Sequence, residues 1–574
     1  MEMNVISTDV LVVGGGVAGC RAAIEAANLG VKTMLVTKGQ VARSGCSAHS
    51  PGTVSAAGPW SDPRDSWERY MADAIKGGEY MADQELARVL FSEIGDRFVE
   101  MEKYGLYWRK NDDGTLDAYK LGGHSYPRSF SSNKPCTAKN IMQALRGELV
   151  RLHVPIKEDT IVTSLLTEGE KVVGATALDY LNTSFKVFRA KSVILCTGHC
   201  DQIFPWATVS KECTAESQAM AYQAGAEMID LENHLFQGAK LSYYPYMYMP
   251  IHSCRERQRR HDTGYSRRLL NADGKDFFAE YRAVAPPGIA PKTLILIAQV
   301  REIEEGRGTE NDGVYSDLSL IPDLDEVLKQ SKSKIIFENM GIDASKEPFE
   351  TGFASHANTG GIRVNVRSES TVPGLYAAGG TAAPYYGFMR LTGFGLGQGL
   401  VFGKRAGEYA AIRAAGIEMQ EIDWNQVEEE QDHIHALLKS AGEEGFSPAA
   451  VKRMIQLNNW EHFGPIKDES GLKKGLKEIN RINEEIIPKM VLKTATRRYN
   501  YGLVEAIEVL NMLLLSEIKM RAALMRKETR GPFVRRDYLQ RNDKDWLKHI
   551  VVKRVKGEAK FWTEPVEFPY VKPE

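Results

Sequence analysis

The 574-residue chain has no long apolar run, no paired-cysteine motif and no excess of charge of either sign. No stretch of 18 or more apolar residues occurs, so a transmembrane helix is not expected. The net charge of −2 argues against a nucleic-acid-binding protein and against direct binding to an anionic membrane. The first residues, MEMNVISTDV, lack the basic and apolar segments of a secretory signal. We therefore expect a cytoplasmic protein, with any membrane contact made through a partner.

Cysteine is scarce and scattered along the chain. None of the seven cysteines belongs to a C-x-x-C pair, so neither an iron–sulfur cluster nor another metal site is expected within this chain. A disulfide framework is not expected in a reducing compartment, and most of the cysteines are predicted to be small buried side chains. Cys46 differs because it lies in a loop rich in glycine and serine, RSGCSAHSPGTVSAAGP (43–59).

The most informative feature that the chain does contain is the glycine turn Gly14, Gly16 and Gly19. An apolar strand (10–13) enters this turn, an alanine-rich helical segment (21–29) leaves it, and a second apolar strand (32–36) follows. Strand, G-x-G-x-x-G, helix and strand together form the dinucleotide-binding unit. The pyrophosphate of the ligand is expected at the helix N-terminus, where free N–H groups and the helix dipole favour negative charge.

The order of predicted elements indicates an α/β protein with several domains. We assign residues 1–238 to the first part of a Rossmann-like domain and residues 239–345, which are aromatic, basic and interrupted by proline, to an inserted α+β domain. Residues 346–415 return to the Rossmann-like domain with the segments GIRVNV and VPGLYAAGG. Residues 416–574 are predicted to form a charged helical domain, helical to about residue 526, followed by a tail that contains proline.

Three later segments help to identify the dinucleotide. A NAD site places an acidic residue at the end of the second strand, but here that strand ends at Thr37 and Lys38. Thr37 and Lys38 are therefore expected to contact the cofactor in place of an acidic residue. A strand ending at Thr197 and Gly198 and a much later one ending near Gly379 are predicted to return to the same ligand. A domain that meets its cofactor from both sides of an insertion favours a large, extended cofactor, and FAD fits best.

Several motifs together resemble the flavoprotein subunits of the succinate dehydrogenase/fumarate reductase superfamily, which includes L-aspartate oxidase and the adenylylsulfate reductase α subunit. These motifs are VVGGGVAGCRAA, RSGCSA, ILCTG, REIEEGRG, HANTGGIRV, VPGLYAAGG, GFMRLTGFGLGQGLVFGKRAG and RKETRGPFVRRDY. The resemblance implies an FAD-binding domain, a capping domain and a helical C-terminal domain, with the active site between the first two. It also implies an iron–sulfur partner subunit, and flavin contacts from Gly395 and Leu396.

The chain departs from this family near the flavin. Succinate and fumarate enzymes often attach FAD to a histidine in R-S-H-T, whereas this chain reads Ser44-Gly45 at that point. Ser44 and Gly45 are therefore expected to contact a non-covalently bound FAD, with His49 as a weaker alternative for a covalent link. The glutamate of the family's A-A-G-E segment is replaced by Gly380.

The capping segment departs further. The family's F-H-P-T motif is replaced by Phe236-Gln237-Gly238-Ala239, and the position of the proton-donating arginine falls on Lys292. Lys292 is a candidate to hold an anion or move a proton, and an exposed surface lysine is the alternative. The basic run 255–260 is either an interaction patch or an ordinary solvated segment.

Two substrate-binding positions of the family remain. His356 in SHANTGG and Arg390 in GFMRLTGFG match the pair that binds a substrate carboxylate beside the flavin. Arginine suits this role because its planar donors grip an oxyanion with two hydrogen bonds. A structural role for each residue is the alternative.

Three hypotheses follow from these residues. In the first, the chain is an FAD-dependent oxidoreductase subunit that acts on a small anionic substrate such as an enoate or acyl-thioester. In the second, it performs sulfur-oxyanion chemistry like adenylylsulfate reductase, which the Glu232-Asn233 pair and the proline at 291 resemble. In the third, it relays electrons with a degenerate substrate pocket.

Overall fold

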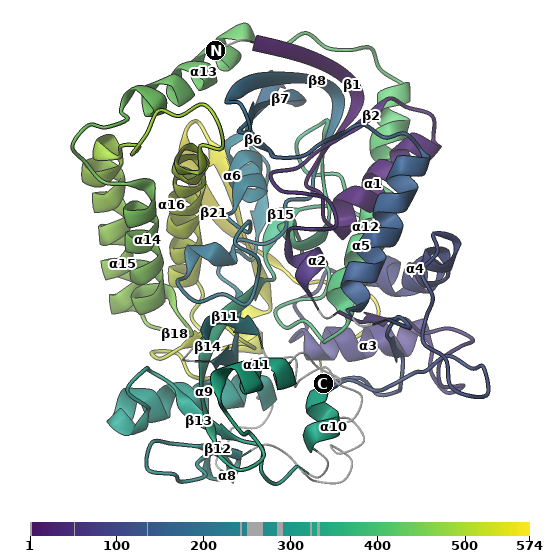
Figure 1. Ribbon diagram of the computed structural model, residues 1–574, viewed down its shortest axis with the longest axis vertical. Helices are drawn as coiled ribbons and strands as arrows, with labels where there is room; N and C mark the ends of the chain where they lie inside the picture. Colours follow the sequence, from purple (N-terminus) through teal and green to yellow (C-terminus); the bar gives the residue numbers. More distant parts are fainter. Residues whose placement is uncertain are drawn as a thin grey trace.

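A seven-stranded sheet forms the centre of the N-terminal part of the protein (Figure 1). The computed structural model describes residues 3–50, 52–134, 136–241, 244–248, 268–283, 291–321, 324–329 and 333–573. The strand order is β5 (Ile156–Lys157), β2 (Thr33–Val36), β1 (Met3–Val13), β8 (Ser184–Leu195), β7 (Lys171–Asp179) and β6 (Thr160–Glu168), with β16 (Leu375–Ala377) also paired to β8.

The strands β2, β1, β8 and β16 are parallel, and their carboxyl ends meet at one edge of the sheet. Val13 pairs with both Val36 and Leu195, and Leu195 pairs with Ala377. The residues that follow each strand therefore emerge side by side, although they come from distant parts of the sequence. In open α/β sheets this edge is where ligands bind.

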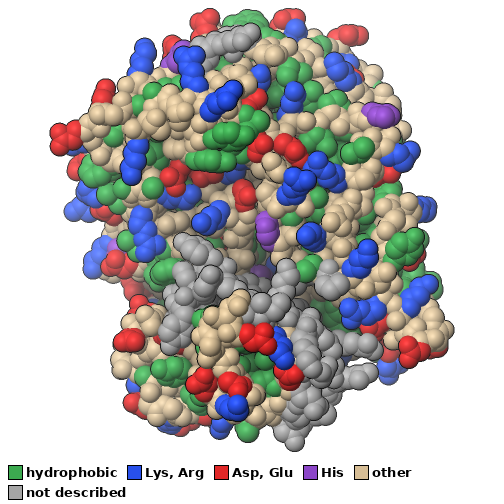
Figure 2. Space-filling model, viewed as in Figure 1, with side chains coloured by type: hydrophobic (Ala, Val, Ile, Leu, Met, Phe, Trp, Pro, Cys, Tyr) green, Lys and Arg blue, Asp and Glu red, His purple; other side chains and the backbone are tan. Residues whose placement is uncertain are grey.

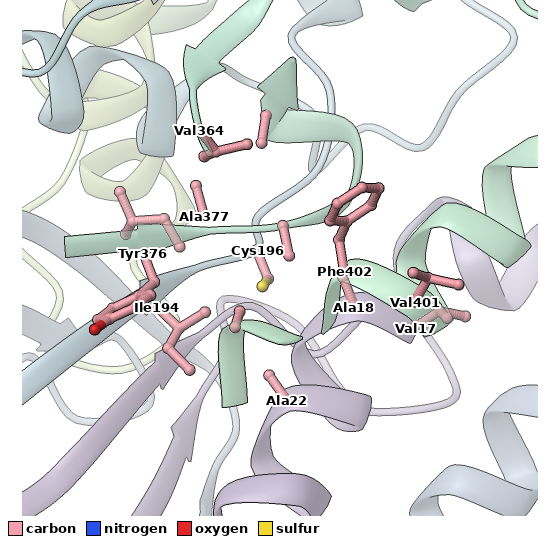
Figure 3. Packing of buried hydrophobic residues seen from close by; sticks show 14 of the residues in the cluster. Val17, Ala18, Ala22, Ile194, Cys196, Val364, Tyr376, Ala377, Val401 and Phe402 are labelled. Carbon is pink, nitrogen blue, oxygen red and sulfur yellow. The ribbon is translucent and has the colours of Figure 1, made fainter. Parts of the chain in front are cut away.

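Two helices beside this sheet pack closely against each other. Helix α1 (Val17–Asn28) lies against α12 (Phe394–Ala415), and Figure 3 shows Val17, Ala18 and Ala22 of α1 near Val401 and Phe402 of α12. A Cβ atom added at Gly403 or Gly407 would lie 2.5 or 2.3 Å from the carbonyl oxygen of Ala18 or Ala22. Glycine is therefore required for this helix contact. Helix α5 (Thr137–Arg151) also packs on α1.

The segment 65–104, expected to be helical, forms two helices. Ser66 begins α3 (Trp67–Gly77) by accepting a hydrogen bond from the Arg69 amide, and Asp83 begins α4 (Gln84–Lys103) in the same way. The chain turns between them because Glu79 and Tyr80 both have positive φ. The adjoining short elements are α2 (Cys46–His49), β3 (Val54–Ser55) and β4 (Ser129–Phe130).

A second, antiparallel sheet forms the lower part of Figure 1. Its order is β11 (Tyr244–Tyr248), β10 (His234–Leu241), β14 (Phe349–Asn358), β13 (Val314–Asp317) and β12 (Arg268–Leu270). The helices described beside it are α8 (Phe278–Ala283), α9 (Pro291–Glu302), α10 (Leu324–Lys329) and α11 (Ser333–Met340). This sheet includes residues on both sides of the expected boundaries at 238/239 and 345/346, because β10 and β14 pair with each other.

The C-terminal helices stand beside the first sheet. They are α13 (Trp424–Lys439), α14 (Pro448–Phe463), α15 (Glu469–Arg481) and α16 (Tyr501–Met525), and α14 and α16 pack on the 3-10 turn η1 (Asp201–Ile203). Strand β18 (Ile466–Lys467) lies between α14 and α15, and η5 (Ile482–Ile486) and η6 (Ile487–Lys489) lie between α15 and α16. Strand β19 (Val534–Arg535) and α17 (Asp543–Trp546) follow α16.

The tail contains a β-hairpin that the sequence pattern did not predict. Strands β20 (Lys548–Val555) and β21 (Glu558–Pro565) join β9 (Met228–Ile229), β15 (Gly361–Arg363) and β17 (Ala382–Ala383) in a third sheet. Val551 and Val552 of β20 are buried against this sheet. The end of the chain is therefore part of the structure around the cofactor domain.

The surface carries charges of both signs. On the face shown in Figure 2, acidic and basic side chains are interspersed among the described residues. Within the described part of the chain, no helix is both long and apolar enough to cross a membrane.

Candidate functional site

The predicted dinucleotide turn leaves no room for a side chain. Gly14 has φ +112°, and a Cβ atom there would lie 2.4 Å from the carbonyl oxygen of Cys196. A Cβ atom at Gly19 would lie 1.8 Å from the carbonyl oxygen of Gly14. Helix α1 begins immediately after Gly16, so the first amides of the helix lie at the turn. This cradle suits a pyrophosphate, as the sequence predicts.

Lys38 at the end of β2 is held by two carboxylates. Its Nζ donates to Thr214 Oγ1 and Glu508 Oε1, both at 2.7 Å, and also to Glu216. Burial alone lowers the pKa of Lys38, but Glu216 and Glu508 outweigh burial and raise it above its usual value. Lys38 stays charged and ties β2 to helices α6 (Glu216–Gln223) and α16.

Glu216 was not among the predicted site residues. Its Oε2 is buried and has no hydrogen-bond partner among the described residues. Thr37, which the sequence predicted as a contact, is buried beside Gly15. Nucleotide sites of this topology use a carboxylate to accept from ribose hydroxyls, and β2 itself lacks one. Glu216 brings a carboxylate to the end of β2 from a distant helix, and the acidic residue of the segment TAES was the signal for it.

The loop after β2 turns back on itself. Ser44 Oγ accepts from the Gln40 amide at 2.7 Å, and Gly45 has φ +78° with open space around its Cα atom. His49 is exposed, and its Nδ1 lies 2.9 Å from the carbonyl oxygen of Gly45 in the same turn. The Ser47 hydroxyl accepts from the amide of Val17, so this loop meets the first turn of α1.

The edge after β8 carries Thr197, Gly198 and His199. Thr197 Oγ1 donates to Ser217 Oγ at 2.8 Å. The His199 ring occupies the space beside Gly380, where a Cβ atom would lie 2.6 Å from the ring. Gly380, the departure noted in the A-A-G-E segment, therefore accommodates His199. The Nδ1 atom of His199 is 3.2 Å from Asn358 Oδ1.

The later glycine segments contribute three more predicted contacts. Gly379 lies beside α1, and Gly395 and Leu396 lie in the first turn of α12. A Cβ atom at Gly379 would lie 2.9 Å from Ala18 Cβ. One at Gly395 would lie 3.1 Å from Arg390 Nη1, and Leu396 is buried in the first turn of α12. The predicted contacts from three parts of the chain therefore converge around the N-terminus of α1.

Arg390, in the loop before α12, lies beside His356 of β14. Arg390 Nη2 lies 3.4 Å from His356 Nε2, and His356 Nδ1 lies 2.7 Å from Thr208 Oγ1. Arg390 is half-buried and makes no ion pair with a carboxylate among the described residues. Burial, and then the positive charge of Arg390, lower the pKa of His199, although Asp201 opposes both. The arrangement presents a partly buried guanidinium that can bind an anion.

A buried polar cluster holds the strand that carries His356. Asp201 Oδ1 accepts from Ser355 Oγ at 2.7 Å and lies 3.2 Å from His234 Nε2. Burial lowers the pKa of His234 to about 4, so this imidazole is neutral near pH 7. These contacts join β10, β14 and the turn after β8, and fix the strand that carries His356.

Two predicted features cannot be placed in this site. Lys292 lies in the first turn of α9, but its side chain lies outside the described part of the structure. The basic run 255–260 also lies outside the described residues. Among the residues that are described, no group of three or more His, Cys, Asp or Glu side chains could hold a metal ion.

Comparison with known proteins identifies the family. Residues 9–396 match the family model described as FAD binding domain, and residues 452–574 match the one described as Fumarate reductase flavoprotein C-term. A fumarate reductase (CoM/CoB) subunit of Methanothermobacter marburgensis is 31% identical over 564 residues, which cover 98% of this chain and 100% of that protein. The chain belongs to the family of fumarate reductase and succinate dehydrogenase flavoprotein subunits.

Solved structures of the family agree. Mycobacterium smegmatis Sdh1 in complex with UQ1 aligns with a TM-score of 0.88 and 27% identity, over 99% of this chain and 96% of that one. Adenylylsulfate reductase from Archaeoglobus fulgidus aligns with a TM-score of 0.81 and 21% identity, over 99% and 97%, which shows the fold alone. The predicted family, the α/β fold with a Rossmann-like FAD-binding domain, and the FAD-dependent oxidoreductase class are confirmed.

Proposed function

We propose that this flavoprotein transfers two electrons between non-covalently bound FAD and a small anionic substrate, an enoate or an acyl-thioester, and exchanges them with an iron–sulfur partner. One observation carries the proposal. The half-buried guanidinium of Arg390 lies 3.4 Å from His356 and makes no ion pair with a carboxylate in the described part of the chain. A desolvated arginine without a counter-ion is well suited to hold an anion.

The residues of the edge described above would hold FAD. Gly14, Gly16 and Gly19 leave room for its pyrophosphate, and Glu216 offers an acceptor at the end of β2. Non-covalent binding is supported by Gly45, which has no side chain, and by His49, which is exposed and contacts its own turn. When bound, FAD supplies two-electron redox chemistry.

The protein's own groups would then orient the substrate. Arg390 binds the carboxylate or thioester oxygen, and His356, held by Thr208, adds a second polar contact. Charge that develops on this oxygen during reduction is stabilised by the same donors, which are already in position. The buried Asp201, His234 and Ser355 keep the His356 strand in place.

The alternative of sulfur-oxyanion chemistry rested in part on the Glu232-Asn233 pair. Both residues are fully buried, and Glu232 accepts from Arg526 Nε at 2.7 Å while Asn233 donates to the carbonyl oxygen of Phe388. These contacts assign the pair to packing, so it does not favour that alternative.

An anaerobic reoxidation experiment tests the proposal. The reduced flavoprotein is mixed with fumarate, other enoates, enoyl-thioesters or adenylylsulfate, and flavin absorbance is followed. One enoate or thioester should reoxidise wild type quickly, and Arg390→Ala should slow this step about 10²–10³-fold at unchanged FAD content. Arg367→Ala, which removes an exposed arginine over the Tyr409 ring, is the matched control.

Three outcomes would contradict the proposal. Reoxidation by adenylylsulfate alone would favour sulfur-oxyanion chemistry, and no reoxidation by any compound would favour an electron relay. A wild-type rate in Arg390→Ala would show that the substrate binds elsewhere.

A further inference from the structure

Two cysteines from distant parts of the chain meet beside the cofactor turn. The Sγ atoms of Cys46 and Cys213 are 3.3 Å apart, although 167 residues separate them in the sequence. A disulfide bond needs about 2.05 Å between these atoms, so a small side-chain movement would close it. Both cysteines are free thiols in the structure.

The backbone on both sides of this pair is anchored. Cys46 begins α2, and its carbonyl oxygen accepts from the Ser50 amide at 2.9 Å. The Cys213 carbonyl oxygen accepts from the Gln202 amide at 3.1 Å, and the Cys213 amide donates to Ser210. The two sulfur atoms therefore face each other because of the fold, not because a loose loop happens to bring them close.

The pair is connected to two parts of the proposed FAD site, the turn before α1 and the segment that carries His199. Ser47, next to Cys46, contacts the first turn of α1, where the pyrophosphate is expected. The Cys213 sulfur accepts a hydrogen bond from the backbone of His199. The positive charge of Arg390, in the proposed substrate site, contributes to lowering the pKa of the His199 side chain. The pair is therefore connected to the turn proposed to hold the pyrophosphate through Ser47, and to the surroundings of Arg390 through His199.

We propose that Cys46 and Cys213 form a redox-active dithiol–disulfide pair that exchanges two electrons with the bound flavin. Oxidation breaks two S–H bonds, forms one S–S bond and releases two electrons and two protons. FAD takes up the same two electrons and two protons when it becomes FADH2, so the exchange balances and is reversible. This inference rests on the proposed FAD site.

The two thiols differ in exposure. Cys46 is half-buried, whereas Cys213 is 4% exposed. A thiolate or disulfide from solution can therefore reach Cys46 more easily, and Cys213 completes the bond from inside. Among the other described cysteines, the Cys20 thiol donates to the carbonyl oxygen of Gly15.

The test uses the full-length protein with FAD. The protein is oxidised with excess oxidised glutathione, desalted, and titrated anaerobically with dithionite while flavin absorbance is recorded. Wild type should take up about four electrons per FAD, whereas Cys46→Ser and Cys213→Ser should take up about two. Cys136→Ser, which removes a half-buried thiol outside the pair, should behave like wild type.

Mass spectrometry gives an independent readout that needs no variant. After oxidation and alkylation, wild type should yield a disulfide-linked peptide pair that contains Cys46 and Cys213, and reduction should release both. Two alkylated thiols and an uptake of two electrons would overturn the inference. A disulfide that forms while the holoenzyme still takes up only two electrons would also overturn it, because the flavin would not communicate with the pair.

The two proposals fail in different ways. If the purified protein carries no flavin absorbance, the FAD site itself is wrong, whatever the thiols do. If FAD binds and reacts with substrate but no disulfide forms, only the cysteine proposal falls.

Discussion

At the scale of single residues, the cofactor turn depends on the absence of side chains. Gly14 combines a positive φ with a backbone carbonyl 2.4 Å from the position of a Cβ atom. Gly30, just after α1, also has a positive φ of +79°, but nothing lies within 4 Å of its Cβ position. A side chain at Gly14 would therefore cause both backbone strain and a steric clash, whereas one at Gly30 would cause backbone strain alone.

We predict that Gly14→Ala reduces bound FAD by at least about tenfold, because the methyl group must displace the Cys196 carbonyl and reshape the turn. Gly30→Ala should cost about 1–2 kcal/mol of stability through backbone strain alone and leave FAD content unchanged. The flavin-to-protein absorbance ratio and the thermal midpoint measure both effects. Normal flavin content in Gly14→Ala would show that the turn does not contact the cofactor.

At the scale of elements, the short parallel pair β18–β19 buries a lysine. Lys467 is 5% exposed, and its Nζ lies 4.8 Å from the ring centroid of Phe533 and 5.7 Å from that of Phe463. Burial, and then the charge of Arg535, lower the pKa of Lys467 to about 7. The unfolded chain holds this proton up to about pH 10.4.

This pKa shift makes stability depend on pH. Between about pH 7 and pH 10.4 the unfolded state binds more protons, so the free energy of unfolding rises by up to about 1.4 kcal/mol per pH unit, and this gain is lost as the pH falls. We predict that Lys467→Met flattens the dependence and stabilises the protein at pH 6. Thermal midpoints at pH 6, 7.5 and 9 test this, with exposed Lys473→Met as control. Parallel curves for wild type and Lys467→Met would contradict it.

At the scale of the whole molecule, one buried arginine connects three parts of the chain. Arg526, at the end of α16, donates to Glu232 at 2.7 Å, to Glu528 at 3.0 Å and to the carbonyl oxygen of Lys548 at 2.8 Å. Its guanidinium also lies 4.7 Å from the centroid of the Phe388 ring. The guanidinium of Arg526 therefore connects the helical domain, the tail hairpin and the segment before Arg390.

We predict that Arg526→Met destabilises the protein by about 3–5 kcal/mol, because it leaves buried carboxylates without a partner. Adding Glu232→Gln should restore part of the loss. Arg521→Met, which removes a surface arginine paired with Glu517, should cost less than about 1 kcal/mol. Urea or thermal unfolding measures all three, and equal losses for the two arginines would refute the assignment.

Much of the cofactor domain could be predicted from the sequence. The glycine turn, the strands on either side of it and α1 follow from local patterns, because alternation of strand, turn and helix is encoded within about 30 residues. The return of the chain at Thr197 and Gly379 was also readable, since both follow short apolar strands. His356 and Arg390 came from resemblance, and their roles remain predictions.

Other features had no local signal. The tail hairpin β20–β21 forms strands because β20 pairs with β9. Residues 548–565 alone give no clear strand pattern, since strand propensity depends strongly on the neighbouring strands. Glu216 is held at the end of β2 by Lys38 and Thr214, which both donate to its Oε1 atom. The His199 ring fills the space that Gly380 leaves open, a pairing of residues 181 positions apart.

The sequence by itself thus determined the cofactor class and the α/β fold class, because glycine spacing and apolar periodicity act over a few neighbouring residues. The tertiary structure decided which distant side chains share one site: Arg390 with His356, Lys38 with Glu216, and Cys46 with Cys213. These pairings depend on strand register and helix packing, which place residues within hydrogen-bond distance only once the whole chain has folded.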